Sequence, residues 1–304
     1  MLKTLFRATP ALAALAFAAP HTAAAHAIAG VRVFPVTLTL DDPGVADEAT
    51  LPQIAYQPEP GQSQLQFQWE YDKTITPDTA LIYNHGYDIY SVTGAKRATG
   101  FENVVLTGKW QAWVVPEREF LLSLGVQREF AGDGHAVANG IADAHGSTAP
   151  TVYFGKGLGD LPIGVFRPLA VTGELSYVVP DRKLNSDGSN NGSVTAWNGG
   201  LSLQYSLPYL QSQVKDYDLP DVIGRLIPLV ELNYNSPAAG PAVGNPTLLS
   251  FAAGAIWLGD TYQVGLEAVI PGNRNTGKNI GYIAQVHYFF DDIFPNTLGK
   301  PLFP

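Results

Sequence analysis

Two groups of residues raise the question of hydrolytic chemistry. Glu267 and His287 fall on adjacent predicted strands, and His85 and many serines offer further polar groups. A hydrolase needs a nucleophile, a base and an orienting group that converge on one point. The sequence carries no Gly-x-Ser-x-Gly elbow or other nucleophile signature. We therefore predict no catalytic residue and no enzymatic activity, with His287 serving as a hydrogen-bonding partner within its strand.

An acidic cluster is the second candidate for chemistry. Asp41, Asp42, Asp47 and Glu48 lie close together around a Pro-Gly pair. Carboxylate oxygens at this density suit calcium, but their spacing does not match the helix–loop–helix calcium motif. The chain has no cysteine, which excludes disulfides and thiolate metal sites. We expect a solvated acidic turn in the connection 41–60, with no metal and no cofactor.

The elements that position polar side chains are predicted strands. From Leu65 to Tyr71, apolar residues alternate without a break with glutamines and a glutamate. Successive side chains of a strand point to opposite faces, so one face is apolar and the other polar. The pattern recurs in runs of about ten residues, which is typical of a barrel whose outer face contacts lipid. We predict an all-β, antiparallel, up-and-down transmembrane barrel.

The strand count rests on ten clear runs and two weaker ones. Adding Val31–Leu40 and Thr151–Leu158 gives twelve strands, and it places most long loops on one side of the membrane and most short turns on the other. Pro35 is the difficulty in the first of these, because a closed ladder needs an N–H donor there. Ten strands is the alternative count.

The polar faces of these strands define the candidate site, the lining of the barrel lumen. Four of its members are carboxylates and one is a lysine, so we predict a weakly anionic, amide-rich interior that passes neutral or cationic solutes more readily than anions. The alternative is a filled structural interior whose groups pair with each other and with water. The predicted lining residues are Gln64, Gln66, Gln68, Glu70, Lys109, Gln111, Gln127, Glu174, Gln204, Glu231, Asn233, Gln263, Glu267, Gln285 and His287.

Composition agrees with a membrane location. Charged residues make up 15% of the 304-residue chain, well below the roughly 25% of soluble domains. The net charge of -9 disfavours nucleic acid as a partner, because binding the phosphate backbone needs a basic surface. The expected partners are outer-membrane lipid, the outer-membrane assembly machinery and a small-molecule solute.

The N-terminus resembles a secretory signal. Lys3 and Arg7 precede an apolar stretch too short to span a bilayer, and Ala23–Ala25 fits a cleavage site, with cleavage after residue 27 as a second possibility. We predict a signal peptide over residues 1–25, followed by a single barrel domain over 26–304 that ends in a short tail, 291–304. Export of a barrel places the protein in the outer membrane of a Gram-negative bacterium.

Three segments resemble a family of bacterial outer-membrane proteins named for the MetA pathway of phenol degradation. They are Thr39–Glu48, Tyr153–Pro162 and Arg167–Glu174, and the last strand, Tyr282–Phe290, also fits. The resemblance implies an outer-membrane barrel that passes small, often aromatic or hydrophobic, molecules, and it supplies no catalytic residues. One departure is that fourteen residues follow Phe290, whereas barrels of this kind often end on an aromatic residue of the final strand.

Two other interpretations remain open at this point. One is a closed structural barrel without transport. The other is a soluble, exported, lipocalin-like binding protein, which would bury the Leu65–Tyr71 face in a core.

Overall fold

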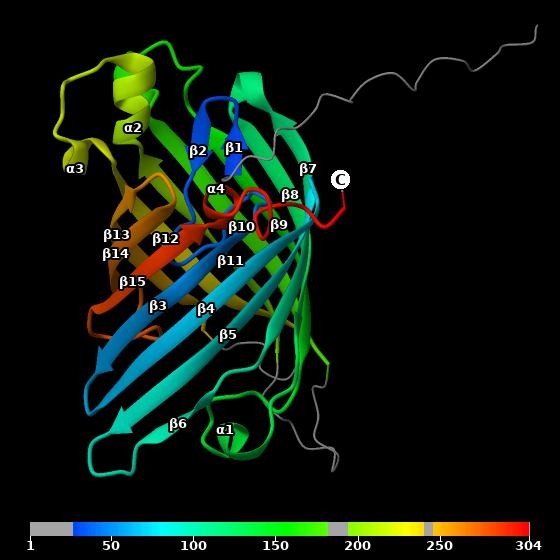
Figure 1. Ribbon diagram of the computed structural model, residues 1–304. Helices are drawn as coiled ribbons and strands as arrows, with labels where there is room; N and C mark the ends of the chain where they lie inside the picture. Colours follow the sequence, from blue (N-terminus) through cyan, green and yellow to red (C-terminus); the bar gives the residue numbers. More distant parts are fainter. Residues whose placement is uncertain (1–26, 182–193, 240–245, 304) are drawn as a thin grey trace, which may run out of the picture.

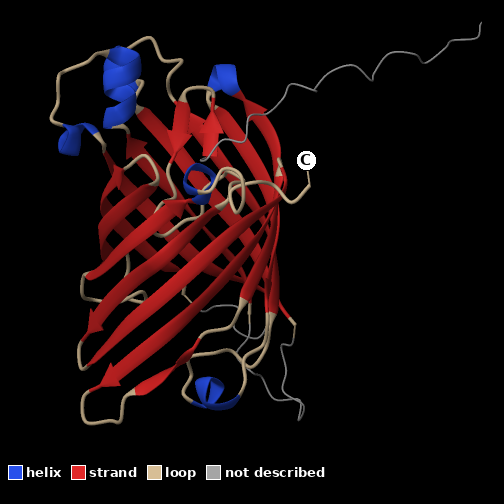
Figure 2. Cartoon of the chain, in the orientation of Figure 1, coloured by secondary structure: helices blue, strands red, loops and turns tan. Residues whose placement is uncertain are grey.

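Twelve antiparallel strands form a closed β-barrel in the computed structural model, which describes residues 27–181, 194–239 and 246–303 (Figures 1 and 2). The predicted fold class and strand number are therefore confirmed. In chain order the barrel strands are β3 (Glu48–Glu59), β4 (Gln62–Thr76), β5 (Thr79–Val92), β7 (Val105–Val115), β8 (Phe120–Glu129), β9 (Ser147–Gly157), β10 (Leu169–Pro180), β11 (Thr195–Tyr205), β12 (Leu226–Ala239), β13 (Leu248–Leu258), β14 (Tyr262–Pro271) and β15 (Gly281–Phe289).

The barrel closes between its last and first strands. β15 pairs antiparallel with β3, from Tyr282 opposite Tyr56 to Phe289 opposite Glu48, and every other barrel strand pairs with its neighbours in sequence. A closed ladder leaves no unpaired edge, which is the condition for a sheet to cross the hydrocarbon of a bilayer.

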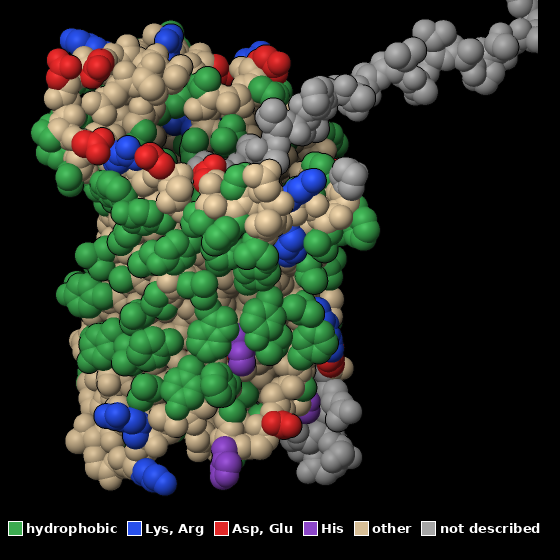
Figure 3. Space-filling view, viewed as in Figure 1, with side chains coloured by type: hydrophobic (Ala, Val, Ile, Leu, Met, Phe, Trp, Pro, Cys, Tyr) green, Lys and Arg blue, Asp and Glu red, His purple; other side chains and the backbone are tan. Residues whose placement is uncertain are grey.

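The two faces of the wall differ as the alternation predicts. Leu266 is 61% exposed, whereas the flanking Gln263 and Glu267 are at most 1% exposed. Hydrophobic side chains form a band around the middle of the barrel, and most charged ones lie above or below it (Figure 3). An apolar outside around a polar inside is the reverse of a soluble carrier such as a lipocalin. The barrel is an outer-membrane protein.

The two ends of the barrel are unequal. One end carries the tight turns at residues 77–78 and 259–261 together with β1 (Ala27–Ala29), β2 (Arg32–Phe34) and the C-terminus (Figure 1). The other end carries most of the long connections, including β6 (Ala98–Phe101), which pairs only with β5, and α1 (Gly134–Ala138). There are two exceptions: the tight turn at 60–61 is at this second end, and the long connection 206–225 is at the first. Short turns are periplasmic and long loops extracellular in such barrels, so we call these the periplasmic and extracellular ends.

Short helical turns cap the barrel. At the periplasmic end they are η1 (Pro116–Arg118), η2 (Gly164–Phe166), α2 (Leu207–Tyr209), η3 (Leu210–Val214), α3 (Asp221–Gly224) and α4 (Phe290–Ile293). In the described part of the chain, no helix is long and apolar enough to cross a membrane. The predicted signal peptide, 1–25, lies outside the described residues.

The first strand differs from the prediction. Val31–Leu40 is not a wall strand, and the connection predicted at 41–60 contains β3, the true first strand. Three prolines, at 52, 58 and 60, hid β3 in the sequence. The ladder accommodates Pro52 because a bulge interrupts the β3–β4 pairing between Thr50 and Gln53. Thr151–Leu158 is confirmed as a strand, β9, which begins four residues earlier, at Ser147.

A second bulge changes which residues face outward on β7. The pairing with β8 shifts between Gln111 and Trp113, so the alternation reverses there. Trp113 is 64% exposed on the outside, and Val114 packs against the buried cluster that includes Phe34 and Leu121. The period-two alternation of β7 therefore holds only as far as the bulge.

Candidate functional site

A stretch of chain occupies the lumen. Residues 35–47, here the luminal segment, leave the β1–β2 hairpin and cross the interior before β3 begins, and all but Thr39 and Asp41 are buried. Since these residues make no strand pairing, the side chains of the barrel must satisfy their backbone groups. The barrel is therefore filled at its periplasmic side by its own N-terminal region.

Amide side chains of the wall supply the hydrogen bonds that the luminal segment does not obtain from strand pairing. Gln263 and Gln285 donate to the Val36 carbonyl at 2.5 and 3.1 Å, and Gln53 donates to the Leu38 carbonyl at 2.9 Å. Gln53 also donates to Gln285 Oε1 at 3.1 Å, across the closing seam between β3 and β15. The glutamines of the wall thus bind the segment by backbone carbonyls, which any residue type supplies.

Thr39 is bound through its side chain. Its hydroxyl donates to Glu231 Oε2 at 2.7 Å and accepts from Asn233 Nδ2 at 2.7 Å, and its N–H donates to the same Glu231 oxygen at 3.1 Å. Three hydrogen bonds on one residue fix the register of the segment against β12.

Lys109 supplies the positive charge at the centre of the lumen. It is 3% exposed, and its ammonium lies 2.8 Å from Asp41 Oδ2 and 3.9 Å from Asp42 Oδ1. It also donates to the Asp42 carbonyl at 2.9 Å and lies 4.6 Å from the ring centroid of Tyr153. The acidic cluster was expected to be a solvated turn, but Asp42, Asp47 and Glu48 are buried. Lys109 lies beside Asp41 and Asp42, whereas Lys73 contacts Asp47 and His287 contacts Glu48. The described residues contain no group of three or more side chains that would hold a metal ion.

Carboxyl groups outnumber cations in this interior. Glu48, Asp72, Glu231 and Glu267 are each at most 3% exposed, and Glu174 hydrogen bonds to the backbone of Asp41. Among the described residues, Asp72 Oδ1, Glu231 Oε1 and both oxygens of Glu267 have no hydrogen-bond donor. Glu231 is the acidic neighbour of Glu267. The described part of the lumen therefore holds more carboxyl groups than basic side chains.

His287 has two partners in this interior. Its Nδ1 lies 2.9 Å from Thr50 Oγ1, and its Nε2 lies 2.9 Å from Glu48 Oε2. A hydroxyl, an imidazole and a carboxylate in this order resemble a hydrolytic triad. However, His287 is 0% exposed and Glu48 3% exposed. The carboxylate that contacts His287 is Glu48, while Glu267 of the adjacent strand lies opposite Ile283.

The remaining predicted lining residues lie along the same inner face. Gln64 donates to Asp88 Oδ2 at 2.9 Å, while Gln66 and Gln68 donate to Glu102. Gln127 donates to the Tyr153 hydroxyl at 3.1 Å, and Gln204 to Thr172 Oγ1 at 3.1 Å. Gln111 lies near the periplasmic rim, where its N–H donates to the Asp78 carbonyl at 2.8 Å.

An open cavity of about 150 Å³ borders the luminal segment. Residues 36–41 form one side of it. Its polar wall consists of Thr50, Gln53, Gln68, Glu70, Asn84 and Gln285. Taking roughly 30 Å³ for each water, the cavity has space for about five waters, or for one small solute.

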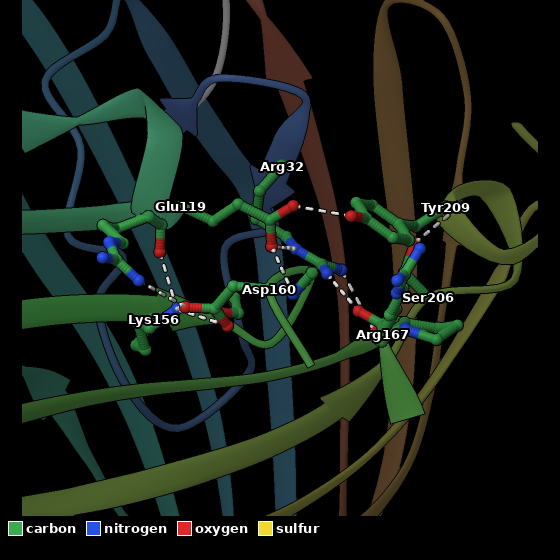
Figure 4. A network of polar contacts seen from close by, with 11 residues as sticks. Arg32, Glu119, Lys156, Asp160, Arg167, Ser206 and Tyr209 are labelled. Atoms are coloured by element: carbon green, nitrogen blue, oxygen red, sulfur yellow. Dashed lines mark hydrogen bonds and ion pairs between the residues drawn. The ribbon is translucent and has the colours of Figure 1, made fainter. Parts of the chain in front are cut away.

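An anchor outside the membrane holds the hairpin that precedes the luminal segment (Figure 4). Arg32 Nε lies 3.0 Å from Glu119 Oε2, and the Tyr209 hydroxyl donates to Glu119 Oε1 at 2.6 Å. Arg32 also donates to the carbonyls of Pro168 and Arg167 at 3.1 and 2.5 Å, and its guanidinium lies 3.7 Å from the Tyr209 ring centroid. Residues from four connections thus meet at one buried ion pair.

Burial dominates the titration of this anchor. Desolvation lowers the pKa of Arg32, and the neighbouring Glu119 opposes that effect. Burial, together with the hydrogen bond to Glu119, raises the pKa of Tyr209 to about 12. Tyr209 itself is 8% exposed.

A third contact joins the end of the luminal segment to the C-terminal tail. Asp47 accepts hydrogen bonds from Lys73 and Thr74 of β4, and its N–H donates to Asp291 Oδ1 at 3.1 Å. Burial, followed by the charge of Asp47, raises the pKa of Asp291 to about 7. Further along the tail, the N–H groups of Leu302 and Phe303 donate to carbonyls of β4 at 3.2 and 2.8 Å.

Sequence reasoning missed the residues that fill the lumen. Thr39, Asp41 and Asp42 were placed in a strand or an external loop, and Gln53, Asp72 and Glu102 were not considered. The alternation of Gln53, Ala55 and Gln57 with Ile54 and Tyr56 was the available signal for β3, and the flanking prolines obscured it.

Comparisons with known proteins support the fold. No family model matches the sequence, and no curated protein matches it. Among solved structures, the barrel is similar to the COG4313 outer-membrane channel of Pseudomonas putida F1, with a TM-score of 0.53, 11% identity, and coverage of 84% of this chain and 99% of that one. A KdgM porin in complex with disordered oligogalacturonate gives a TM-score of 0.43 at 8% identity, covering 79% and 98% of the two chains. LpxR from Salmonella typhimurium gives 0.43 at 12%, covering 80% and 100%. The similarity to the COG4313 channel, at 11% identity, shows a shared fold.

Proposed function

We propose that this protein is an outer-membrane channel for small neutral or cationic solutes, and that the luminal segment forms its constriction. The observation that carries the proposal is the pairing of a polar, acid-rich lumen with an occupant held by hydrogen bonds to its backbone. A permanent core is normally closed by apolar packing at high density. Here Leu38 packs against Ile227 and Ile256 of the wall, but the backbone of the segment is held by glutamine amides. Water or a polar solute can replace each of those hydrogen bonds.

Charge supports the preference for cations. Glu70 lines the open cavity, and the carboxylates beyond it outnumber Lys109. Rings of acidic side chains favour cations in pores, because an anion entering a narrow acidic lumen meets repulsion that little water screens.

A hydrolase is the less well supported alternative. The Thr50–His287–Glu48 arrangement has the order of a triad, but substrate would need to reach residues that are almost fully buried. A closed structural barrel remains the second alternative, because the lumen is occupied on its periplasmic side.

The solute is inferred from chemistry and resemblance together. The resemblance to the MetA phenol-degradation family suggests small aromatic molecules. A phenol satisfies the charge requirement, since a phenolic hydroxyl with a pKa near 10 is neutral at pH 7. We therefore extend the proposal to uncharged phenols, alongside small cations.

Planar-bilayer recording tests the proposal. In a salt gradient, the wild-type channel should show a reversal potential that indicates cation preference, and Glu70→Gln should reduce the cation-to-anion permeability ratio by about twofold or more. Asp260→Asn is the matched control, because it removes a carboxylate that is exposed on the periplasmic surface. Anion preference would contradict the proposal, and a wild-type barrel that conducts no ions at any voltage would favour the closed structural alternative.

A further inference from the structure

The barrel wall changes its pairing partner near the extracellular end. β5 pairs with β7 from Thr79 to Asn84, and then with β6 from Tyr87 to Tyr90. Residues 102–104 join β6 to β7 at this point, and the Glu102 N–H donates to the Gly86 carbonyl at 2.9 Å. The wall at this position is a connection rather than a paired strand.

A cavity lies against this connection. It measures about 420 Å³ and is bounded on its other side by the β8–β9 connection, which carries α1. α1 packs beside β6 at the extracellular end (Figure 1). The size falls within the ~300–1,000 Å³ range of small-molecule sites. Its apolar lining includes Phe101, Phe130, Ala136 and Ala142.

Asn103 presents an unused acceptor in this cavity. The residue is 9% exposed, and its amide hydrogens go to Glu129 Oε1 at 2.9 Å and the Asp143 carbonyl at 3.1 Å. Among the described residues, no donor reaches its Oδ1. A buried acceptor without a donor loses its hydrogen bonds to water and gains none in return. A ligand that brings an N–H to this oxygen recovers that loss.

Gly132 keeps the approach to this oxygen open. A Cβ at this position would lie 2.5 Å from Asn103 Oδ1 and 2.6 Å from the Ala142 methyl carbon. Any side chain here would therefore cover the acceptor.

The charges and rings around the cavity select the kind of ligand. Asp133, Glu102 and His135 contribute to the lining, and Glu102 also accepts hydrogen bonds from Gln66 and Gln68. In the described part of the chain, no lysine or arginine lines the cavity, although the Arg128 guanidinium lies 5.7 Å from the centroid of the Phe130 ring. Phe101 is held in place by rings on the outer wall, with centroids 5.3 Å from His85 and 5.0 Å from Tyr87. A fixed aromatic wall beside carboxylates and a carbonyl acceptor suits an ammonium on an apolar body.

We propose that this cavity binds a small apolar amine, whose ammonium donates to Asn103 Oδ1 and whose hydrocarbon part lies between Phe101, Phe130 and Ala136. The site is at the extracellular end of the barrel, its lining residues differ from those of the luminal cavity, and its binding can be measured whether or not the lumen conducts.

Calorimetric titration of the purified full-length barrel in detergent micelles tests the site, with phenethylamine as the probe and hydrocinnamate as its anionic counterpart. Saturable binding of the amine is expected, with the anion at least tenfold weaker. Ala136→Leu should fill the cavity and weaken amine binding at least tenfold. Ala138→Leu on the same helix is the matched control, because residue 138 is not part of the lining, and it should leave binding unchanged.

A second variant separates loss of the site from loss of the fold. Gly132→Ala should block the acceptor and weaken amine binding, and the heat-induced unfolding of the barrel in each variant reports whether the wall remains intact. Equal binding of amine and anion, equal effects of Ala136→Leu and Ala138→Leu, or heat equal to that of empty micelles would each overturn the proposal.

Discussion

The hairpin anchor and the lumen hold the same N-terminal region in different ways. In the anchor, both oxygens of Glu119 have partners, and Arg32 donates from all three of its nitrogens. In the lumen, both oxygens of Glu267 and one each of Glu231 and Asp72 have no donor among the described residues. The N-terminal region is thus fixed firmly at the periplasmic rim and less completely satisfied inside the barrel. Any movement that opens the lumen would begin at the luminal segment, with the anchor acting as its fixed end.

The largest effect should come from breaking the anchor. Glu119→Ala leaves the Arg32 guanidinium buried without its carboxylate and should destabilise attachment of the hairpin by about 3–5 kcal/mol. Hydrogen-exchange protection of the β1–β2 amides should then fall more than a hundredfold. Arg118→Ala is the control, because the neighbouring Arg118 is 71% exposed and pairs with Asp160 at 3.7 Å, which predicts a loss below about 1 kcal/mol. Equal protection in the two variants would show that the ion pair does not hold the hairpin.

A smaller effect is expected inside the lumen. Gln263→Leu removes a buried donor to the Val36 carbonyl and should weaken binding of the luminal segment by about 1–3 kcal/mol. Single-channel recording should show more frequent or larger openings.

Gln204→Leu is the matched control for this prediction. Gln204 is equally buried but bonds to Thr172 and Ser202 of the wall. It should lower the unfolding temperature without changing the openings. Similar openings in both variants would mean that the luminal segment does not form the constriction.

The smallest effect concerns the tail and is a dependence on pH. The pKa of Asp291 is about 7 in the folded protein, above its ordinary value of 3.8. A carboxyl whose folded pKa is raised stabilises the folded state below the ordinary pKa, and that contribution is lost as the pH rises through 7. Protection factors of the Leu302 and Phe303 amides should therefore fall between pH 4 and pH 8, and Asp291→Asn should remove most of this change. A rise with pH in the wild type would contradict the assignment.

The sequence predicted the wall well and the occupant of the lumen poorly. Alternation is a local property of a strand, so the runs around Leu65–Tyr71 and Tyr262–Ile270 identified strands directly. The sequence from Val31 to Leu40 also alternates, but residues 32–34 form β2 of the periplasmic hairpin and residues 35–40 lie in the lumen. Period-two alternation does not distinguish a wall strand from such a segment. The pairing of this segment with Gln263 and Gln285 joins residues more than 220 positions apart, which no local pattern encodes.

The anchor and the wall cavity depended on tertiary contacts in the same way. Arg32, Glu119 and Tyr209 come from three separate connections, and each is unremarkable in its own stretch of sequence. The sequence around Asn103 did not indicate a binding site either, because the proposed site depends on a side-chain oxygen that receives no hydrogen bond from the described residues. The residue types on the inward faces predicted a polar, acid-rich interior. Which of these side chains contact each other depends on the tertiary structure.

The pairing of β15 with β3, which closes the barrel, has a consequence for barrel assembly. Gln53 on the first wall strand and Gln285 on the last bond to each other and to the carbonyls of residues 36 and 38. The luminal segment therefore bridges the first and last wall strands through these hydrogen bonds. In a chain that lacks the luminal segment, β3 and β15 would pair while the amides of Gln53 and Gln285 face water. We therefore expect such a truncated chain to form the folded barrel more slowly than the intact chain in a pulse-chase insertion assay.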